Sequence, residues 1–284
     1  MTPDKGRGLF AVVNISRGTR LLVEDPLVTI TPPPLVPSMG FSLAVIEPLV
    51  AEAYAQLTRT QKEQYLSCHE VRFGDEGKDE ESQTDDVASV PSGRLLRILR
   101  SNAYNTRDGR VGLYPLVALI NHDCRPNVLN TDLWVPETLT WQRIIVAARD
   151  IAAGEEIVTT YVPLLADTAT RRSRLSQYGF TCMCKTCAAS SSHEDGTRVR
   201  MRQILDALEE LEEQPAPNQS PEILAGHAAD LAAYIAGNGF VDYAVGTSRL
   251  AAVFAGRAGD TETASYWTAV HRANLALAGE DIAW

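Results

Sequence analysis

The close spacing of Cys182, Cys184 and Cys187 constrains the fold of this chain more than any other feature of its sequence. Five cysteines, three of them crowded together, fit a metal site in a reducing compartment better than a disulfide framework. A tetrahedral structural zinc needs four ligands, so one more is required. We expect Cys124 to supply it, with Cys68 or His193 as the alternative.

Cys124 lies in a stretch, 116–127, where apolar residues run directly into Asn121, His122 and Asp123. This pattern predicts a buried strand or a tight helical turn that delivers hydrogen-bonding groups and one thiol to the same place. A zinc ion bound by Cys124 and the later cysteines would tie the Asn121–His122 loop to a distant part of the chain. Groups on both segments would then share one wall of a pocket.

The composition is that of a globular protein, because 45% hydrophobic content can build a sizeable core in one large domain or two smaller ones. No apolar run approaches the ~20 residues needed to span a bilayer, and no secretory signal follows Met1. We therefore expect an intracellular protein, cytoplasmic or nuclear, without membrane contact. The formal net charge of -10 argues against nucleic acid and favours a basic protein or peptide partner.

Glycines and prolines divide the first part of the chain into short elements. Gly6, Gly8 and Gly18 interrupt β-prone runs, which predicts short strands joined by tight turns. The prolines at 32–34 end this sheet, because proline cannot donate to a β-ladder. A helical stretch over about 41–68 is expected to follow, with a helix start at Thr58 or Thr60.

The middle of the chain alternates between polar and β-prone segments. The acidic run 75–86 is expected to be a solvated loop, and 92–105 a helix that presents Asn102 at its polar end. Strands are predicted over 129–134 and 139–148, which are rich in β-branched and aromatic residues. A turn at Gly154 then leads into a strand that ends on Tyr161.

The last third of the chain shifts to Ala, Leu and Glu, which predicts a helical array. The expected helices cover 198–213, 221–236, 241–258 and 261–278. Small polar residues near 190–197 suggest a flexible linker, and so a domain boundary.

Several separated motifs, taken together in order and spacing, resemble the SET domain of protein-lysine methyltransferases. They are Gly6–Ala11, Asn102, Asn121–Asn127, Gly154–Ile157 with Tyr161, and Tyr178–Cys187. The resemblance implies an α+β fold of small β-sheets over 1–189, with a helical insert at about 41–105 and a zinc-binding post-SET tail at 178–187. The all-α C-terminal domain, 198–284, resembles that of the SMYD branch and its fungal relatives.

This resemblance implies an enzyme that transfers methyl groups from S-adenosylmethionine to a lysine side chain of a protein or peptide. The implied catalytic residues are Tyr161 and Tyr178. The implied cofactor-binding residues are Lys5, Arg7, Leu9, Asn102, Asn121, His122, Tyr161 and Phe180. The implied ligands of a structural zinc are Cys124, Cys182, Cys184 and Cys187.

Two departures limit what the resemblance implies. SMYD proteins carry a zinc-binding MYND module, for which this chain has no cysteine-rich segment, and Asp123 stands where the family usually has serine. Partners that depend on a MYND module are therefore not expected. Two alternatives stay open: a SET-like module that binds cofactor or peptide without methyl transfer, and a SET enzyme that acts on a small molecule.

Overall fold

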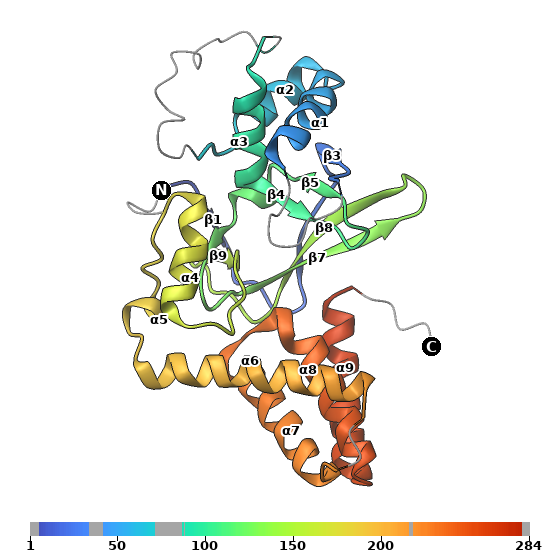
Figure 1. Ribbon diagram of the computed structural model, residues 1–284. Helices are drawn as coiled ribbons and strands as arrows, with labels where there is room; N and C mark the ends of the chain where they lie inside the picture. Colours follow the sequence, from blue (N-terminus) through green and yellow to red (C-terminus); the bar gives the residue numbers. More distant parts are fainter. Residues whose placement is uncertain (1–5, 34–41, 72–86, 88, 216–217, 280–284) are drawn as a thin grey trace.

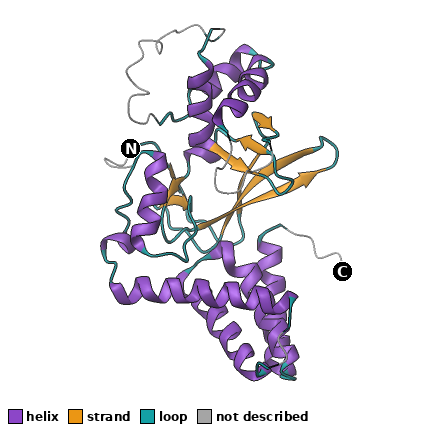
Figure 2. Cartoon of the chain, in the orientation of Figure 1, coloured by secondary structure: helices purple, strands orange, loops and turns teal. Residues whose placement is uncertain are grey.

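The computed structural model describes residues 6–33, 42–71, 87, 89–215 and 218–279. Small sheets lie in the middle of the molecule, between a group of shorter helices at one end and a bundle of long helices at the other (Figure 1). Colouring by secondary structure shows the strands gathered between these helical parts (Figure 2). The predicted α+β class with an all-α C-terminal region is confirmed. Lys5 and the acidic run 75–86 lie outside the described residues.

The described strands form three sheets of three strands each. In sheet order they are β1 (Leu9–Phe10), β9 (Glu156–Thr159) and β6 (Asn121–His122); β2 (Arg20–Glu24), β8 (Thr140–Ala147) and β7 (Val128–Val135); and β3 (Val28–Ile30), β5 (Val111–Leu113) and β4 (Ala103–Asn105). The hairpin β7–β8 confirms the two strands predicted there. β9 ends at Thr159, so Tyr161 lies just beyond the strand that was expected to end on it.

One buried carboxylate fixes the approach to β6. Glu24 at the end of β2 accepts hydrogen bonds from the backbone N–H groups of Leu116 and Val117 at 2.8 to 3.1 Å. These N–H groups start the 3₁₀ helix η2 (Val117–Leu119), whose first donors have no partner within the helix. The predicted stretch is therefore a tight helical turn followed by a short strand.

The helical insert consists of α1 (Leu43–Ala55), α2 (Arg59–Leu66) and α3 (Ser92–Asn102). The helical stretch predicted over about 41–68 is divided into two helices. The second begins at one of the two predicted starts, Thr58, which caps it through a capping box with Gln61. The helix predicted over 92–105 ends at Asn102. Its last residues instead form β4, since Ala103 is extended and the segment pairs with β5.

The chain ends in a run of helices, and the four long ones confirm the predicted array. The elements are α4 (Thr168–Leu175), η3 (Ser176–Tyr178), α5 (Lys185–Ala188), α6 (Ser192–Glu213), α7 (Pro221–Asn238), α8 (Val241–Arg257) and α9 (Thr261–Leu277). The flexible linker predicted at 190–197 is wrong, because Ser191 caps α6 by accepting a hydrogen bond from the Glu194 N–H. Among the described helices, none combines the length and apolar character that crossing a membrane requires.

One hydrophobic cluster joins the later cysteines to these helices. It contains the buried thiols of Cys124 and Cys187 together with Leu205 and Leu208 of α6 and Leu231 of α7. Apolar contacts therefore run from the cysteine segment into the helical array. Separate clusters fill the helical insert and the space between the first two sheets.

Candidate functional site

The parallel pairing of β6 with β9 brings the predicted site residues together. Asn121 lies opposite Val158 and His122 opposite Thr159, so Tyr161 follows directly beside them. Antiparallel pairing of β1 with β9 places Leu9 opposite Ile157. Three segments that are far apart in the sequence thus meet at one edge of a small sheet.

The side chain of Asn121 connects β6 to β9 and to the residues just before β1. Its Nδ2 atom donates to Glu156 Oε1 at 2.8 Å and to the carbonyl oxygen of Arg7 at 3.1 Å. The backbone of Gly8 lies so close that a Cβ there would be 2.6 Å from Asn121 Nδ2 and 2.9 Å from Glu156 Oε1. Gly8 is therefore required for close packing here. Sequence analysis did not identify Glu156 as a partner of Asn121.

His122 is buried, and its two ring nitrogens have different partners. Nδ1 accepts a hydrogen bond from the backbone N–H of Tyr161 at 3.1 Å, which assigns the ring proton to Nε2. Nε2 lies 3.4 Å from the sulfur of Cys124 and so donates toward it. The histidine thus couples the backbone at Tyr161 to the thiol cluster.

The hydroxyl of Tyr161 donates to the carbonyl oxygen of Ile120 at 2.6 Å. Burial raises the pKa of Tyr161 above its ordinary value, and the neighbouring Tyr104 and Tyr178 raise it further. The phenol is therefore neutral at pH 7. It can donate and accept hydrogen bonds, but it is a poor candidate for a general base.

The rings of Tyr161, Tyr178 and Phe180 form an aromatic cluster around this hydroxyl. The centroid of Tyr161 lies 5.0 Å from that of Tyr178 and 6.5 Å from that of Phe180. His122 closes the cluster, with ring centroids at 5.5 Å from Tyr161 and 6.3 Å from Phe180. Such a surface can pack against a planar or cationic group and exclude water from it.

Arg7 and Asn102 meet a different segment, 67–71, from two sides. Arg7 donates from Nη2 to the carbonyl oxygen of Ser67 at 2.7 Å, and Asn102 donates from Nδ2 to that of His69 at 2.6 Å. Val71, at the end of the segment, lies beside Gly179, where a Cβ would approach its side chain to 3.2 Å. This segment, which the sequence did not indicate as a partner of Arg7 or Asn102, thus connects both residues to the neighbourhood of Phe180.

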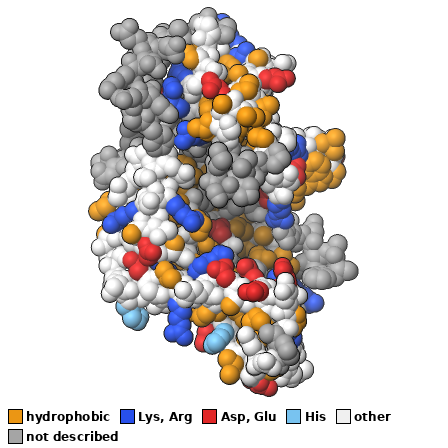
Figure 3. All heavy atoms as spheres, in the orientation of Figure 1, with side chains coloured by type: hydrophobic (Ala, Val, Ile, Leu, Met, Phe, Trp, Pro, Cys, Tyr) orange, Lys and Arg blue, Asp and Glu red, His pale blue; other side chains and the backbone are white. Residues whose placement is uncertain are grey.

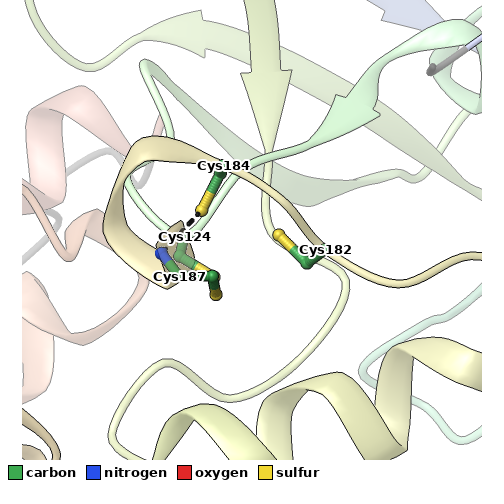
Figure 4. Close-up of side chains that lie close together, drawn as sticks. All are labelled: Cys124, Cys182, Cys184 and Cys187. Atoms are coloured by element: carbon green, nitrogen blue, oxygen red, sulfur yellow. Dashed lines mark hydrogen bonds between the residues drawn. The ribbon is translucent and has the colours of Figure 1, made fainter. Parts of the chain in front are cut away.

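The four predicted metal ligands converge, as Figure 4 shows. Their sulfur atoms all lie within 4.8 Å of one another, and the sulfurs of Cys124 and Cys187 are 3.5 Å apart. Zinc–sulfur bonds of ~2.3 Å place tetrahedral sulfurs about 3.8 Å apart, so the arrangement can accept such an ion. Cys68 is not part of the cluster.

Electrostatics also favour a cation among these thiols. Hydrogen bonds within the group raise the pKa of Cys124 above its ordinary value, with burial and the charge of Cys184 adding to the rise, and hydrogen bonds lower the pKa of Cys184. Four thiols this close cannot all ionise without a compensating positive charge. A divalent cation would remove the repulsion and hold all four as thiolates.

Two arginines of α4 support the cysteine segment, and sequence reasoning missed both. Arg171 is fully buried, and its Nη2 atom donates to Thr168 Oγ1 at 2.9 Å and to the sulfur of Cys187 at 3.5 Å. Arg172 donates to the carbonyl oxygens of Cys182 and Cys187 at 3.2 Å each. These contacts orient the ligands and offset negative charge on sulfur. Arg171 is 0% exposed, and this burial of a charged group is visible only in the structure.

The chain is similar to the SET domain and to proteins named as lysine methyltransferases. The sequence pattern of the SET domain matches residues 6–162. Histone-lysine N-methyltransferase set5 of Schizosaccharomyces pombe is 30% identical over 187 residues, which cover 66% of this chain and 48% of that protein. N-lysine methyltransferase SMYD2 of Homo sapiens is 39% identical over 95 residues, which cover 33% of this chain and 20% of that protein. The matched region thus spans half or less of these relatives.

Among solved structures, the SET domain of LSMT bound to lysine and AdoHcy aligns with 95% of this chain and 85% of its own length. The TM-score is 0.35 and the sequence identity is 14%, values too low to support a comparison of the sites.

Proposed function

The chain belongs to the SET domain family, and we propose that it transfers methyl groups from S-adenosylmethionine to a lysine side chain of a protein or peptide. One observation carries the proposal: half-buried Tyr161 packs its ring against Tyr178, Phe180 and His122, while its hydroxyl donates to the carbonyl oxygen before β6. The relatives named as lysine methyltransferases support it.

The residues proposed to hold the cofactor surround the edge of the first sheet. Asn121 and His122 offer polar groups, and Phe180 offers a ring for the adenine. The backbone at Gly8, next to Leu9, lies against Asn121. Lys5, Arg7, Asn102 and Tyr161 complete the proposed set. S-adenosylmethionine supplies an electrophilic methyl group on a positively charged sulfur when it is bound.

Gly8→Ala tests this placement. The added methyl group would collide with Asn121 and Glu156, so the Asn121 side chain must leave its hydrogen bonds. We expect the dissociation constant for S-adenosylmethionine, measured by titration calorimetry, to rise about tenfold, or about 1.4 kcal/mol. Gly196→Ala, in α6 with open space around the new Cβ, is the matched control and should bind as the parent does. Equal affinity of both variants would contradict the placement.

The aromatic cluster is proposed to prepare the lysine rather than to deprotonate it with a strong base. An amine of pKa ~10.4 costs about 4 to 5 kcal/mol to present uncharged at pH 7. Burial beside a positively charged sulfur lowers that cost through desolvation and through like charge. Tyr161 would align the amine, while Tyr178 would close the other side of its channel.

A structural zinc bound by Cys124, Cys182, Cys184 and Cys187 is part of the proposal. The convergence of four buried sulfurs and the nearby Arg171 support it. The ion would supply no chemistry to the reaction. It would fix segment 178–187, which carries Tyr178 and Phe180, against the loop that carries His122.

The proposed partner is a basic, lysine-bearing protein or peptide, encountered in the cytoplasm or nucleus. The net charge of -10 supports this choice. On the face shown in Figure 3, basic and acidic side chains are interspersed, with no single basic patch of the kind that nucleic acid needs.

Incubation with S-adenosylmethionine labelled on its methyl group, together with a cell extract, tests the activity. We expect label in protein, at lysine, and much slower labelling when Tyr161→Phe replaces the parent chain. Label in small solutes would favour the small-molecule enzyme. Cofactor binding without label in either fraction would favour a binding module.

A further inference from the structure

We propose a second binding site, for an acidic and apolar peptide segment, in the cavity between the SET domain and the helical array. The cavity has a volume of about 650 Å³, within the range of ~300 to 1,000 Å³ found for ligand pockets. Its lining includes none of the residues assigned above to cofactor, lysine or zinc. This inference does not depend on the proposed methyl transfer.

Two walls of different character form the cavity. The SET domain contributes Arg17, Arg125 and Arg149, together with Leu129 and Ala148. The helical array contributes an apolar wall from α7, α8 and α9, which includes Ile235, Phe240, Val245, Trp267, Val270 and Leu277. A bound segment would therefore meet cations on one side and apolar side chains on the other.

The charge of the lining is the reason for choosing an acidic occupant. No Asp or Glu lines the cavity within the described part of the chain, whereas the whole chain carries a net charge of -10. Arg149 is paired with Glu155 at 2.5 Å. Over the same described residues, neither Arg17 nor Arg125 forms an ion pair. Two arginines thus keep their charge for an incoming carboxylate.

The hydrogen bonds of these arginines hold them at the cavity without neutralising them. Arg17 donates from Nε to the carbonyl oxygen of Ala148 at 3.2 Å. Arg125 donates from Nη2 to Asn238 Oδ1, at the end of α7, at 3.2 Å. Both of these side-chain partners are uncharged, and each guanidinium has further N–H donors for a carboxylate. The backbone N–H groups of Arg17 and Arg125 donate to the carboxylates of Asp150 and Asp123, at 2.8 and 2.9 Å.

A peptide fits this lining better than a fatty acid does. A fatty acid has one polar end and needs an otherwise apolar tunnel. Here the helical wall contains the polar side chains of Asn238, Asn274 and Thr247. The wall formed by the SET domain offers two arginines. A short extended segment with alternating acidic and apolar side chains matches both walls.

The test uses the full chain and a fluorescein-labelled peptide that contains Glu, Asp, Leu and Phe but no lysine, so that it cannot be a substrate. Fluorescence anisotropy should show saturable binding that weakens as salt is added. Arg17→Gln combined with Arg125→Gln should weaken binding at least about tenfold. Arg200→Gln, on an exposed part of α6 outside the cavity, is the matched control and should leave binding unchanged.

A second variant tests the cavity itself without changing charge. Ala236 is exposed and lies in the lining near the end of α7, so Ala236→Trp should block the cavity while leaving the core intact. Circular dichroism melting checks that each variant is folded. Undiminished peptide binding in both folded variants would overturn the proposal.

Other occupants would also overturn it. Saturable binding of oleate, with none of the peptide, would make the cavity a lipid site. A concentration-dependent dimer in sedimentation, abolished by Ala236→Trp, would make it an interface between two copies.

Discussion

Tyr161→Phe should reduce the rate of methyl transfer at saturating substrate by about 100-fold while the fold and the affinity for S-adenosylmethionine stay nearly unchanged. This magnitude is typical of removing one hydrogen-bonding group that acts mainly in a transition state. The ring would still pack against Tyr178 and Phe180, so only the hydroxyl and its bond to the Ile120 carbonyl are lost. Single-turnover kinetics, with calorimetry for cofactor affinity, separate the two effects.

Tyr65→Phe is the matched control for this variant. Tyr65 is fully buried and donates its hydroxyl to the carbonyl oxygen of Leu95 at 2.8 Å, in the helical insert. Its loss removes the same kind of hydrogen bond, at a cost in stability of about 1 kcal/mol. The rate should not change. An equal loss of rate in both variants would mean that Tyr161 acts through stability and not in the reaction.

Cys124→Ser should abolish tight zinc binding and weaken binding of S-adenosylmethionine by about tenfold or more. Cys124 is the ligand that joins the loop of Asn121 and His122 to segment 178–187, so its loss releases both walls of the cofactor site. Metal analysis after exposure to a chelator measures the first effect, and calorimetric titration of cofactor measures the second. Cys68→Ser, outside the cluster, should retain zinc.

The same coupling must work in both directions. If zinc strengthens cofactor binding, bound cofactor must strengthen zinc binding by the same factor. A chelator should therefore act more slowly on the cofactor-loaded chain, and should release cofactor before helices α7–α9 unfold, as followed by circular dichroism. Cofactor affinity that is equal with and without zinc would mean that the cysteine segment contributes nothing to the site.

Local patterns predicted most of the elements because their causes are local. Enrichment in β-branched and aromatic residues indicated β7 and β8, and periodic apolar residues indicated the four long helices. The errors occurred where a distant partner decided the local structure. Ala103–Asn105 is a strand because β5 lies beside it, although the helix before it could have continued. Residues 192–197 are helical because Ser191 caps them and the buried Arg198 anchors the helix to the carbonyl oxygen of Leu164.

The residues of the candidate site also fall into those that could be predicted from the sequence and those that depend on distant partners. Residue types and spacing sufficed to propose four cysteine ligands. The resemblance to SET domains added a catalytic Tyr161 and a cofactor contact at Phe180. Glu156, Arg171 and segment 67–71 did not follow from the sequence, because their importance comes from contacts across many residues. Asn102 was expected at a pocket, and its amide instead donates to His69 and Ile98 carbonyls; its contact with cofactor stays a prediction.

The sequence by itself determined the chemistry available to this protein: which side chains can bind a metal, donate a hydrogen bond or pack as rings, and which short segments carry them. The tertiary structure alone decided which of these groups meet. Parallel pairing of β6 with β9 placed His122 beside Tyr161, and packing against the helical array left Arg17 and Arg125 facing an apolar wall. Such contacts depend on burial and on partners distant in the chain, and a linear pattern does not specify either of them.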